Sequence, residues 1–311
     1  MKITFGEYEE KDRGYVIDLL KRTFPGSSDD QTFCWRFETP YHDDAIMVCA
    51  KDCNRVVSFN SWLPWKFSYH GITLTGYQSG ESATDLVYRG KGIWREVIRV
   101  GKEIAQKKGV DFLFGFPSLP SYNVLKKEGY VPIGKLNFRV KLLNPFSIGD
   151  SCEMLKKNFF ENMPFFFQGD RITPLVNHEY MDWRYIENTK SYKLLGYNEH
   201  DNKALFVVRF RKWRGINEAV LLDFLFNSKR DSFVKNSFDY LFRHLQRKTA
   251  WMRTFYVKDS LRGSILKKIF KFKVNSRYEI LMVQPLSEKI NKKDLLNIIN
   301  WDIMPHCVDS Y

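Results

Sequence analysis

Residues 72–80 read Ile72-Thr73-Leu74-Thr75-Gly76-Tyr77-Gln78-Ser79-Gly80, residues 89–92 read Arg89-Gly90-Lys91-Gly92, and a helical pattern then runs to Lys108. The first segment is rich in β-branched residues and roughly alternates apolar with polar side chains, which predicts a β-strand. A glycine inside a strand, as at Gly80, often marks the close approach of a ligand or another backbone. After Gly92 the apolar residues recur on one helical face: Ile93, Val97, Ile98, Ile104 and Ala105. The sequence therefore predicts a strand, a glycine-bearing turn and a helix, in that order.

The turn between these elements suits an anion such as a phosphate. The first N–H groups of a helix have no partner within it, and the helix dipole adds partial positive charge there. Gly90 and Gly92 lack Cβ atoms and would let a phosphate reach those groups, while Arg89 and Lys91 add full charges. An ordinary strand-to-helix turn with solvated basic residues can have the same four residues, so this motif alone leaves both interpretations open.

A longer segment around the turn carries a resemblance to a known family. Residues 81–93 read Glu-Ser-Ala-Thr-Asp-Leu-Val-Tyr-Arg-Gly-Lys-Gly-Ile, which resembles the acyl-CoA-binding motif of the GCN5-related N-acetyltransferase (GNAT) superfamily. Residues 115–122 and 126–130 resemble the strand, short helix and "K-x-G-[YFW]" segment that follow in that family. The resemblance covers about residues 1–143. It departs from the family at Leu86, where many members have a proline.

The resemblance implies the co-substrate and the reaction. Acetyl-CoA or another acyl-CoA would bind with its pyrophosphate on the turn and its pantetheine along strand residues 79–85, and the acyl group would pass directly to an amine. The cofactor-binding residues implied by the motif are Ala83, Thr84, Asp85, Arg89, Gly90, Lys91, Gly92, Ile93 and Trp94. A backbone N–H of the strand could polarise the thioester carbonyl as charge develops on its oxygen.

Two candidate catalytic residues follow from the same resemblance. Glu81 is the candidate general base because it lies on the strand that would face the thioester, and Asp85 is a weaker second candidate. The alternative for Glu81 is a salt-bridged or exposed strand residue. The tyrosine that many relatives use to protonate the leaving thiolate is replaced here by Leu125. Tyr122 is the candidate substitute, with packing of its ring and protonation of the thiolate by solvent as the alternatives.

The second half of the chain echoes the first. Trp35-Arg36 returns as Trp183-Arg184, and the predicted order of strands and helices is also repeated, which predicts two copies of one fold. We therefore expect an α/β (α+β) protein of two tandem GNAT-like domains, each a mixed, mostly antiparallel sheet flanked by helices. The expected ranges are 1–143 for the first domain, 144–164 for a linker and 165–311 for the second.

The two copies are not equivalent at the turn. At the matching offset Arg89-Gly90-Lys91-Gly92 becomes Lys229-Arg230-Asp231-Ser232, which has no glycine and places a carboxylate where a phosphate would lie. The second copy is thus expected to be degenerate and to bind no cofactor.

Composition and charge narrow the function classes. The chain of 311 residues is 44% hydrophobic, so it can bury a large core, and no apolar run approaches the length of a membrane span. Five scattered cysteines and the absence of a signal-peptide pattern favour a reduced, cytoplasmic protein, and the Cys34, His42, Cys49 and Cys53 spacing matches no zinc site, so no metal is expected. The pair His306-Cys307 is interpreted as incidental.

The positive charge is concentrated in the second half. Residues 1–150 hold 21 Lys and Arg against 18 Asp and Glu, and residues 151–311 hold 28 against 18, giving net charges of +3 and +10. This suggests an anionic partner, with a merely solvated surface as the alternative. The preferred partner is a small-molecule amine, such as a nucleotide-linked amino sugar.

Two other function classes remain as alternatives. One is a catalytically silent CoA-binding or sensor protein, because Leu125 replaces the usual acid. The other is nucleic-acid binding through a basic strand, which is disfavoured because no nucleic-acid motif is present. That strand contains Arg209, Arg211, Lys212 and Arg214. The acceptor, the acyl chain length and the oligomeric state do not follow from the sequence.

Overall fold

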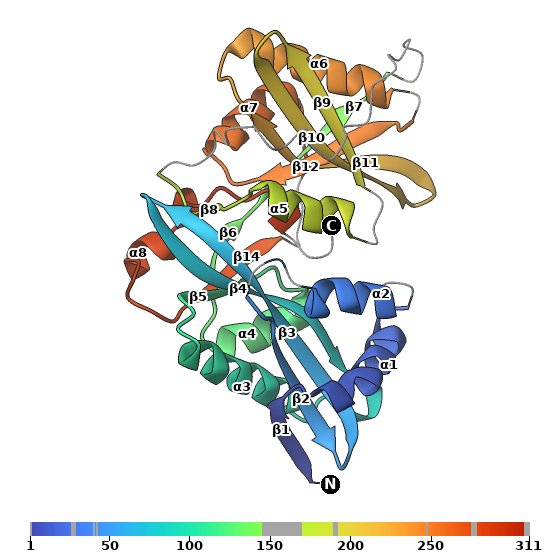
Figure 1. Cartoon of the computed structure of the whole chain (residues 1–311), viewed down its shortest axis with the longest axis vertical. Helices are drawn as coiled ribbons and strands as arrows, with labels where there is room; N and C mark the ends of the chain where they lie inside the picture. The colour runs from blue at the N-terminus through green and yellow to red at the C-terminus, as the bar shows by residue number, and fades with distance from the viewer. Residues whose placement is uncertain are drawn as a thin grey trace. The chain divides into compact units, whose positions relative to one another are not determined.

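The chain forms two compact units, each built from separate segments of sequence (Figure 1). The computed structural model describes residues 2–25, 29–39, 41, 43–144, 170–188, 192–246, 248–274 and 279–307. Unit 1 comprises Met1–Phe67, Thr73–Gly134 and Tyr278–Ile298, and unit 2 comprises Ser68–Ile72, Lys135–Arg277 and Ile299–Tyr311. Of the linker predicted at 144–164, only Asn144 lies within the described residues.

Unit 1 is a mixed sheet with helices on both faces (Figure 1). Its strands lie in the order β1 (Ile3–Glu7), β2 (Ile46–Asp52), β3 (Arg55–Tyr69), β4 (Ile72–Thr84), β5 (Phe112–Gly115), β14 (Ile280–Pro285) and β6 (Val131–Lys135). The strands β1, β2 and β3 pair antiparallel, β4 and β5 pair parallel, and β5 and β14 pair antiparallel. This is the mixed sheet that the sequence predicted.

The alternating side chains of β2 separate two cores in unit 1. Val48 and Ala50 belong to a core that includes residues of α3 (Ile93–Lys107) and α4 (Leu119–Lys127). Cys49 points the other way, into a core that includes residues of α1 (Arg13–Thr23) and α2 (Asp30–Phe33). The two helix pairs therefore cover opposite faces of the sheet.

Helix α3 lies very close to the sheet because of a glycine. A Cβ atom at Gly101 would lie 2.1 Å from the indole ring of Trp62 on β3, so any larger residue would push the helix outward. The Trp62 indole also donates a hydrogen bond to the Tyr130 hydroxyl at 3.2 Å. This packing fixes the depth of α3, and with it the position of the helix N-terminus.

Unit 2 contains a second mixed sheet. Its strands lie in the order β13 (Phe272–Val274), β7 (Asn137–Leu142), β12 (Trp251–Tyr256), β11 (Ile216–Phe226), β10 (Asn202–Trp213) and β9 (Tyr192–Glu199). Helix α6 (Asp231–Leu245) buries the Phe238 ring against Phe206 and Phe224 of the sheet. Apart from a 3₁₀ helix at Leu86–Tyr88 that only unit 1 has among the described residues, the element order of unit 2 repeats that of unit 1: a short helix, a π-helix, three strands, a helix, a strand, a helix and a strand.

The last strand of each half pairs in the sheet of the other unit. Strand β7, from the first half of the chain, lies between β13 and β12, and β14, from the second half, lies between β5 and β6. The ranges expected from the sequence, 1–143 and 165–311, did not include this exchange. A period-two pattern identifies a strand, but it does not identify the neighbour of that strand in a sheet.

None of the helices in the described ranges is long and apolar enough to cross a membrane.

Candidate functional site

In unit 1, the pairing between strands β4 and β5 ends before β4 itself does. Their parallel pairing covers Gly76–Gln78 of β4 and Phe112–Phe114 of β5, whereas β4 continues to Thr84. Where this pairing ends, a Cβ atom on Gly115 would lie 3.5 Å from the Ser79 Cβ, so the two backbones are close there. Beyond Ser79, the β4 backbone runs past the end of its pairing with β5. An extended ligand can hydrogen-bond to such a strand as a neighbouring strand would.

The glycines of the turn adopt the backbone conformation that only glycine takes readily. Gly90 has φ 75°, and Gly92, the N-cap of α3, has φ 76°. A Cβ atom at either residue would meet nothing within 4 Å, so these glycines are not needed for packing and the space above them is open. The turn therefore presents the N-terminal N–H groups of a long helix to open space, as anion binding requires.

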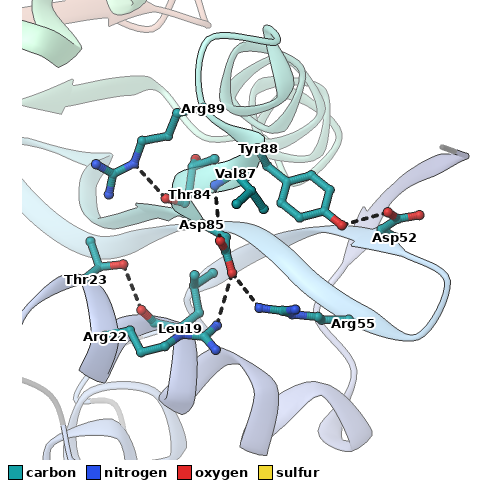
Figure 2. A network of polar contacts seen from close by, with 10 residues as sticks. All are labelled: Leu19, Arg22, Thr23, Asp52, Arg55, Thr84, Asp85, Val87, Tyr88 and Arg89. Carbon is teal, nitrogen blue, oxygen red and sulfur yellow. Dashed lines mark hydrogen bonds and ion pairs between the residues drawn. The ribbon is translucent and has the colours of Figure 1, made fainter.

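The two basic side chains of the turn lie on its exposed rim. The Arg89 Nε donates to the Thr84 carbonyl oxygen at 2.9 Å, which ties the turn back to the end of β4 (Figure 2). The Lys91 Nζ lies 5.4 Å from the centre of the Tyr88 ring, and the Tyr88 hydroxyl donates to the Asp52 Oδ2 at 2.8 Å. Both cations are therefore held beside the glycines.

Asp85 is the centre of a polar network that joins the turn to the rest of unit 1. Its Oδ2 lies 2.6 Å from an Arg55 guanidinium nitrogen and 3.5 Å from one of Arg22, and its Oδ1 accepts a hydrogen bond from the Val87 N–H (Figure 2). Asp85 thus caps the 3₁₀ helix Leu86–Tyr88 and links it to β3 and α1. These contacts favour a structural role for Asp85 over the role of a base.

Comparison with known proteins agrees with this geometry. The family model of the GNAT acetyltransferase domain matches residues 5–133. Residues 5–133 are a GNAT domain. No curated protein matches the chain.

Solved structures resemble the chain over both units. A GNAT from Anabaena variabilis has a TM-score of 0.67 at 10% identity, covering 92% of this chain and 74% of its own. One from Kribbella flavida has a TM-score of 0.62 at 10% identity, covering 91% and 70%. The Saccharomyces cerevisiae N-myristoyltransferase with bound myristoyl-CoA has a TM-score of 0.60 at 11% identity, covering 97% and 84%. At these identities the likeness shows the fold alone, and the GNAT domain at residues 5–133 supports an acyl-CoA-dependent N-acyltransferase in general.

The remaining residues of the expected acyl-CoA motif are either buried in the core or hydrogen-bonded to polar residues of β3. The side chains of Ala83 and Ile93 are buried in the GNAT core, so only their backbone groups are available to a ligand. Thr84 Oγ1 lies 2.8 Å from the Ser58 Oγ. Trp94, in the first turn of α3, donates its indole N–H to the Asn60 Oδ1 at 3.2 Å.

Glu81 lies on β4 of the GNAT domain and is paired with an arginine that the sequence did not mark as a site residue. Its Oε1 lies 2.6 Å from the Arg36 Nη1, and the two side chains are 13% and 4% exposed. Arg36 belongs to a π-helix, Cys34–Glu38. Short π-helical turns are frequent at functional sites. The signal that could have found it is the repeated Trp-Arg pair, since Arg184 also lies in a π-helix, Asp182–Ile186, of unit 2.

Leu125 and Tyr122 lie one turn apart on α4 with different surroundings. Leu125 is 3% exposed and packs in the GNAT core, so nothing polar occupies that position. Tyr122 is half-buried against the same core, and its hydroxyl makes no hydrogen bond within the described ranges. Tyr122 therefore has a hydroxyl group that could donate a proton, whereas Leu125 has none.

The matching turn of unit 2 lacks the geometry of the GNAT turn. β11 ends at Phe226 and α6 begins at Asp231, which leaves a shorter connection in which residues 227–230, all described, have no positive φ. The N-cap of α6 is Arg230, whose guanidinium is ion-paired with Glu199. We find no groups of three or more His, Cys, Asp or Glu positioned for a metal in the described part of either unit.

Proposed function

We propose that unit 1 binds one acyl-CoA along residues 79–94 and transfers its acyl group directly to an amine. The observation that carries this proposal is the succession of two features along the chain. β4 runs past the end of its pairing with β5, and a turn with two positive-φ glycines then leads into α3. An elongated ligand with a phosphate at one end would use both.

Each part of the ligand has a matching group in this arrangement. The pantetheine arm would hydrogen-bond to the free side of β4 beyond Ser79, and the pyrophosphate would accept hydrogen bonds from the N–H groups of the turn. Arg89 and Lys91 would neutralise phosphate charge from the rim, where both are exposed. Unit 2 has no positive-φ residue in its shorter turn, so one ligand per chain is expected.

The proposed chemistry is a nucleophilic addition followed by elimination. The amine nitrogen attacks the thioester carbonyl carbon, the C–S bond breaks, and the amine loses one proton while the thiolate gains one. Glu81 is the proposed acceptor of the amine proton, directly or through water, since it projects from the same strand that would hold the thioester. Tyr122 or solvent would protonate the thiolate.

The identities of donor and acceptor belong to the same proposal. We take acetyl-CoA as the donor and a primary amine on a small anionic molecule, such as a nucleotide-linked amino sugar, as the acceptor. The net charge of +13 supports an anionic acceptor, because a positive protein attracts anions at long range. The N-myristoyltransferase likeness makes a longer acyl chain the other donor to test.

Titration calorimetry followed by a thiol-release assay tests the proposal. CoA should bind with a stoichiometry of one, and acetyl-CoA should release free thiol only when a suitable amine is present. Parallel assays with myristoyl-CoA and with neutral and anionic amines would identify the donor and acceptor. Binding without release for any amine would indicate a sensor protein, and absence of CoA binding would overturn the proposal.

A further inference from the structure

We propose that Asn60 is a positioning residue that fixes the distance between the phosphate-binding turn and the pantetheine-binding strand. The inference rests on the proposed function and concerns how the two parts of that site are held together. Asn60 lies on β3, is fully buried, and is a polar side chain that contacts both β4 and α3. A buried amide is costly unless it is hydrogen-bonded, so its partners must explain its presence.

The amide oxygen of Asn60 joins the strand to the helix. It accepts hydrogen bonds from the Ser82 hydroxyl of β4 and from the Trp94 indole N–H of α3, the latter at 3.2 Å. Because an indole nitrogen can only donate, the atom facing Trp94 must be the oxygen of the amide. The orientation of the Asn60 side chain is therefore determined by its surroundings.

The amide nitrogen of Asn60 adds a second contact with β4. It donates to the Ser61 carbonyl oxygen at 2.9 Å and to the Ser79 Oγ at 3.4 Å. Ser79 lies just beyond the last pair that β4 makes with β5, and Ser82 lies further along β4, past that pairing. One side chain thus holds both the beginning and the middle of the segment proposed to bind pantetheine.

Trp94 is the residue of α3 to which Asn60 is hydrogen-bonded. It is the second residue of α3 and comes two positions after Gly92, so its indole ring moves with the N-terminal turn of the helix. Since Gly101 already fixes the depth of α3 against β3, the Asn60–Trp94 bond adds a polar contact close to the turn itself. Asn60 therefore couples two elements that one CoA molecule would touch at once.

This coupling predicts a ligand-dependent effect that general destabilisation would not produce. A ligand that contacts only the turn, or only the strand, should not depend on the distance between them. CoA contacts both, and its affinity should fall when that distance is no longer fixed. The comparison of short and long ligands therefore separates positioning from a merely structural role.

The test compares the full-length protein with Asn60→Leu, which keeps the approximate volume and removes the polar groups. Calorimetry would measure the dissociation constants of CoA, of ADP as a pyrophosphate probe and of pantetheine as a strand probe. We expect an increase of about tenfold or more for CoA, since two hydrogen bonds that link the elements are lost, and a change of less than about twofold for each short probe. Ser61→Ala is the matched control, because its buried hydroxyl on the same strand makes no hydrogen bond within the described ranges.

A second variant keeps the inference testable if Asn60→Leu does not fold. Trp94→Phe removes the indole N–H that reaches Asn60 and keeps a smaller aromatic ring, and the same selective loss of CoA affinity is expected, by about threefold or more. Equal losses for CoA and ADP, or unchanged CoA affinity in both variants, would overturn the role of Asn60. If the unmodified protein binds no CoA, the proposed function itself fails, which is a distinguishable result.

Discussion

The Nη1 of Arg36 lies 2.6 Å from the Oε1 of Glu81, and both side chains are largely buried in unit 1. The guanidinium fixes the orientation of the carboxylate that we propose as the general base. The pair is also part of the packing of the π-helix Cys34–Glu38, because the Arg36 guanidinium carbon lies 5.7 Å from the centre of the Trp35 ring. Substitutions at these two residues therefore test catalysis and stability separately.

Replacing Glu81 by Gln should impair the chemical step. The amide keeps a similar shape but does not accept the amine proton, so we expect kcat to fall roughly 10²–10⁴-fold, the range for loss of a general base. The dissociation constant of CoA should change little. Steady-state kinetics with the amine found in the thiol-release assay would measure the effect, and Asp18→Asn, at an exposed position of α1, provides a carboxylate control. An unchanged rate and pH profile in Glu81→Gln would leave Glu81 with a structural role.

Removing Arg36 should destabilise the protein more than removing both partners. Arg36→Met leaves the Glu81 carboxylate in a largely buried position without its guanidinium, and loss of one partner of a buried pair costs roughly 3–5 kcal/mol. The double variant Arg36→Met/Glu81→Leu should recover much of this loss. Urea unfolding of both variants would measure the two free energies. A double variant no more stable than Arg36→Met would contradict this account.

Gly92→Asp should abolish CoA binding. The substitution places a carboxylate and a Cβ at the proposed phosphate site, and it also forces an ordinary residue to adopt φ 76°. Gly109→Asp is a matched control, because Gly109 follows the same helix, has φ 69° and also borders open space. Both variants should lose roughly 1–2 kcal/mol of stability from the strained backbone. In calorimetry only Gly92→Asp should lose CoA, and a similar loss in Gly109→Asp would argue against the assigned site.

Acidification should destabilise unit 2 through His306. Burial lowers the pKa of His306 to about 4, although the Asp223 carboxylate opposes this, and an unfolded histidine titrates near its ordinary value of 6.5. The unfolded chain therefore binds a proton more readily between those values. The stabilisation is fully present above pH 6.5 and is lost as the pH falls, by up to about 1.4 kcal/mol for each pH unit.

A variant comparison isolates the contribution of His306 from the other groups. The free energy of unfolding of His306→Gln should fall less steeply with decreasing pH between 6.5 and 4 than that of the unmodified protein. His70→Gln changes an exposed histidine of the same unit and should keep the original slope. Equal slopes for the protein and His306→Gln would show that this imidazole does not control acid stability.

A fragment of residues 1–150 should not fold cooperatively. It lacks β14, which lies between β5 and β6, so both of those strands would have an unpaired edge inside the sheet. A single chain that joins residues 1–135 through a flexible linker to residues 279–298 supplies the missing strand and should fold and bind CoA. Thermal unfolding and calorimetry would compare the two. A cooperatively folded 1–150 fragment would contradict the importance of the exchanged strand.

The same joined chain tests the role of the second half in catalysis. If it binds CoA but does not transfer the acyl group to the amine that the whole protein uses, unit 2 contributes to acceptor binding. Full transfer activity would leave unit 2 with a stabilising role.

Local features of the site could be predicted from sequence because their causes are local. The strand at 72–84, the glycine turn and the helix at 93–107 follow from periodicity and from glycine positions within forty residues of each other. Asn60 and Arg36 could not be found in this way. Arg36 is 45 positions from Glu81, and Asn60 is 34 positions from Trp94, and nothing in the local pattern specifies such partners.

The strand exchange was missed for a related reason. The segment 137–142 has the pattern of a strand wherever it pairs, and its antiparallel register with β12 depends on residues more than a hundred positions away. Its closeness in sequence to β6 suggested the sheet of unit 1, because consecutive strands are usually neighbours. Which strands become neighbours depends on how all the strands of the chain compete to pair with one another. The pattern of one segment does not describe that competition.

The position of β14 in the chain also affects how the protein is made. A ribosome releases β5 and β6 long before residues 280–285, so the growing chain carries the acyltransferase half with a gap in its sheet for most of its synthesis. Open strand edges are where nascent chains aggregate and where chaperones bind. The domain that resembles an independent enzyme in sequence is therefore completed only after nearly all of its partner has been translated.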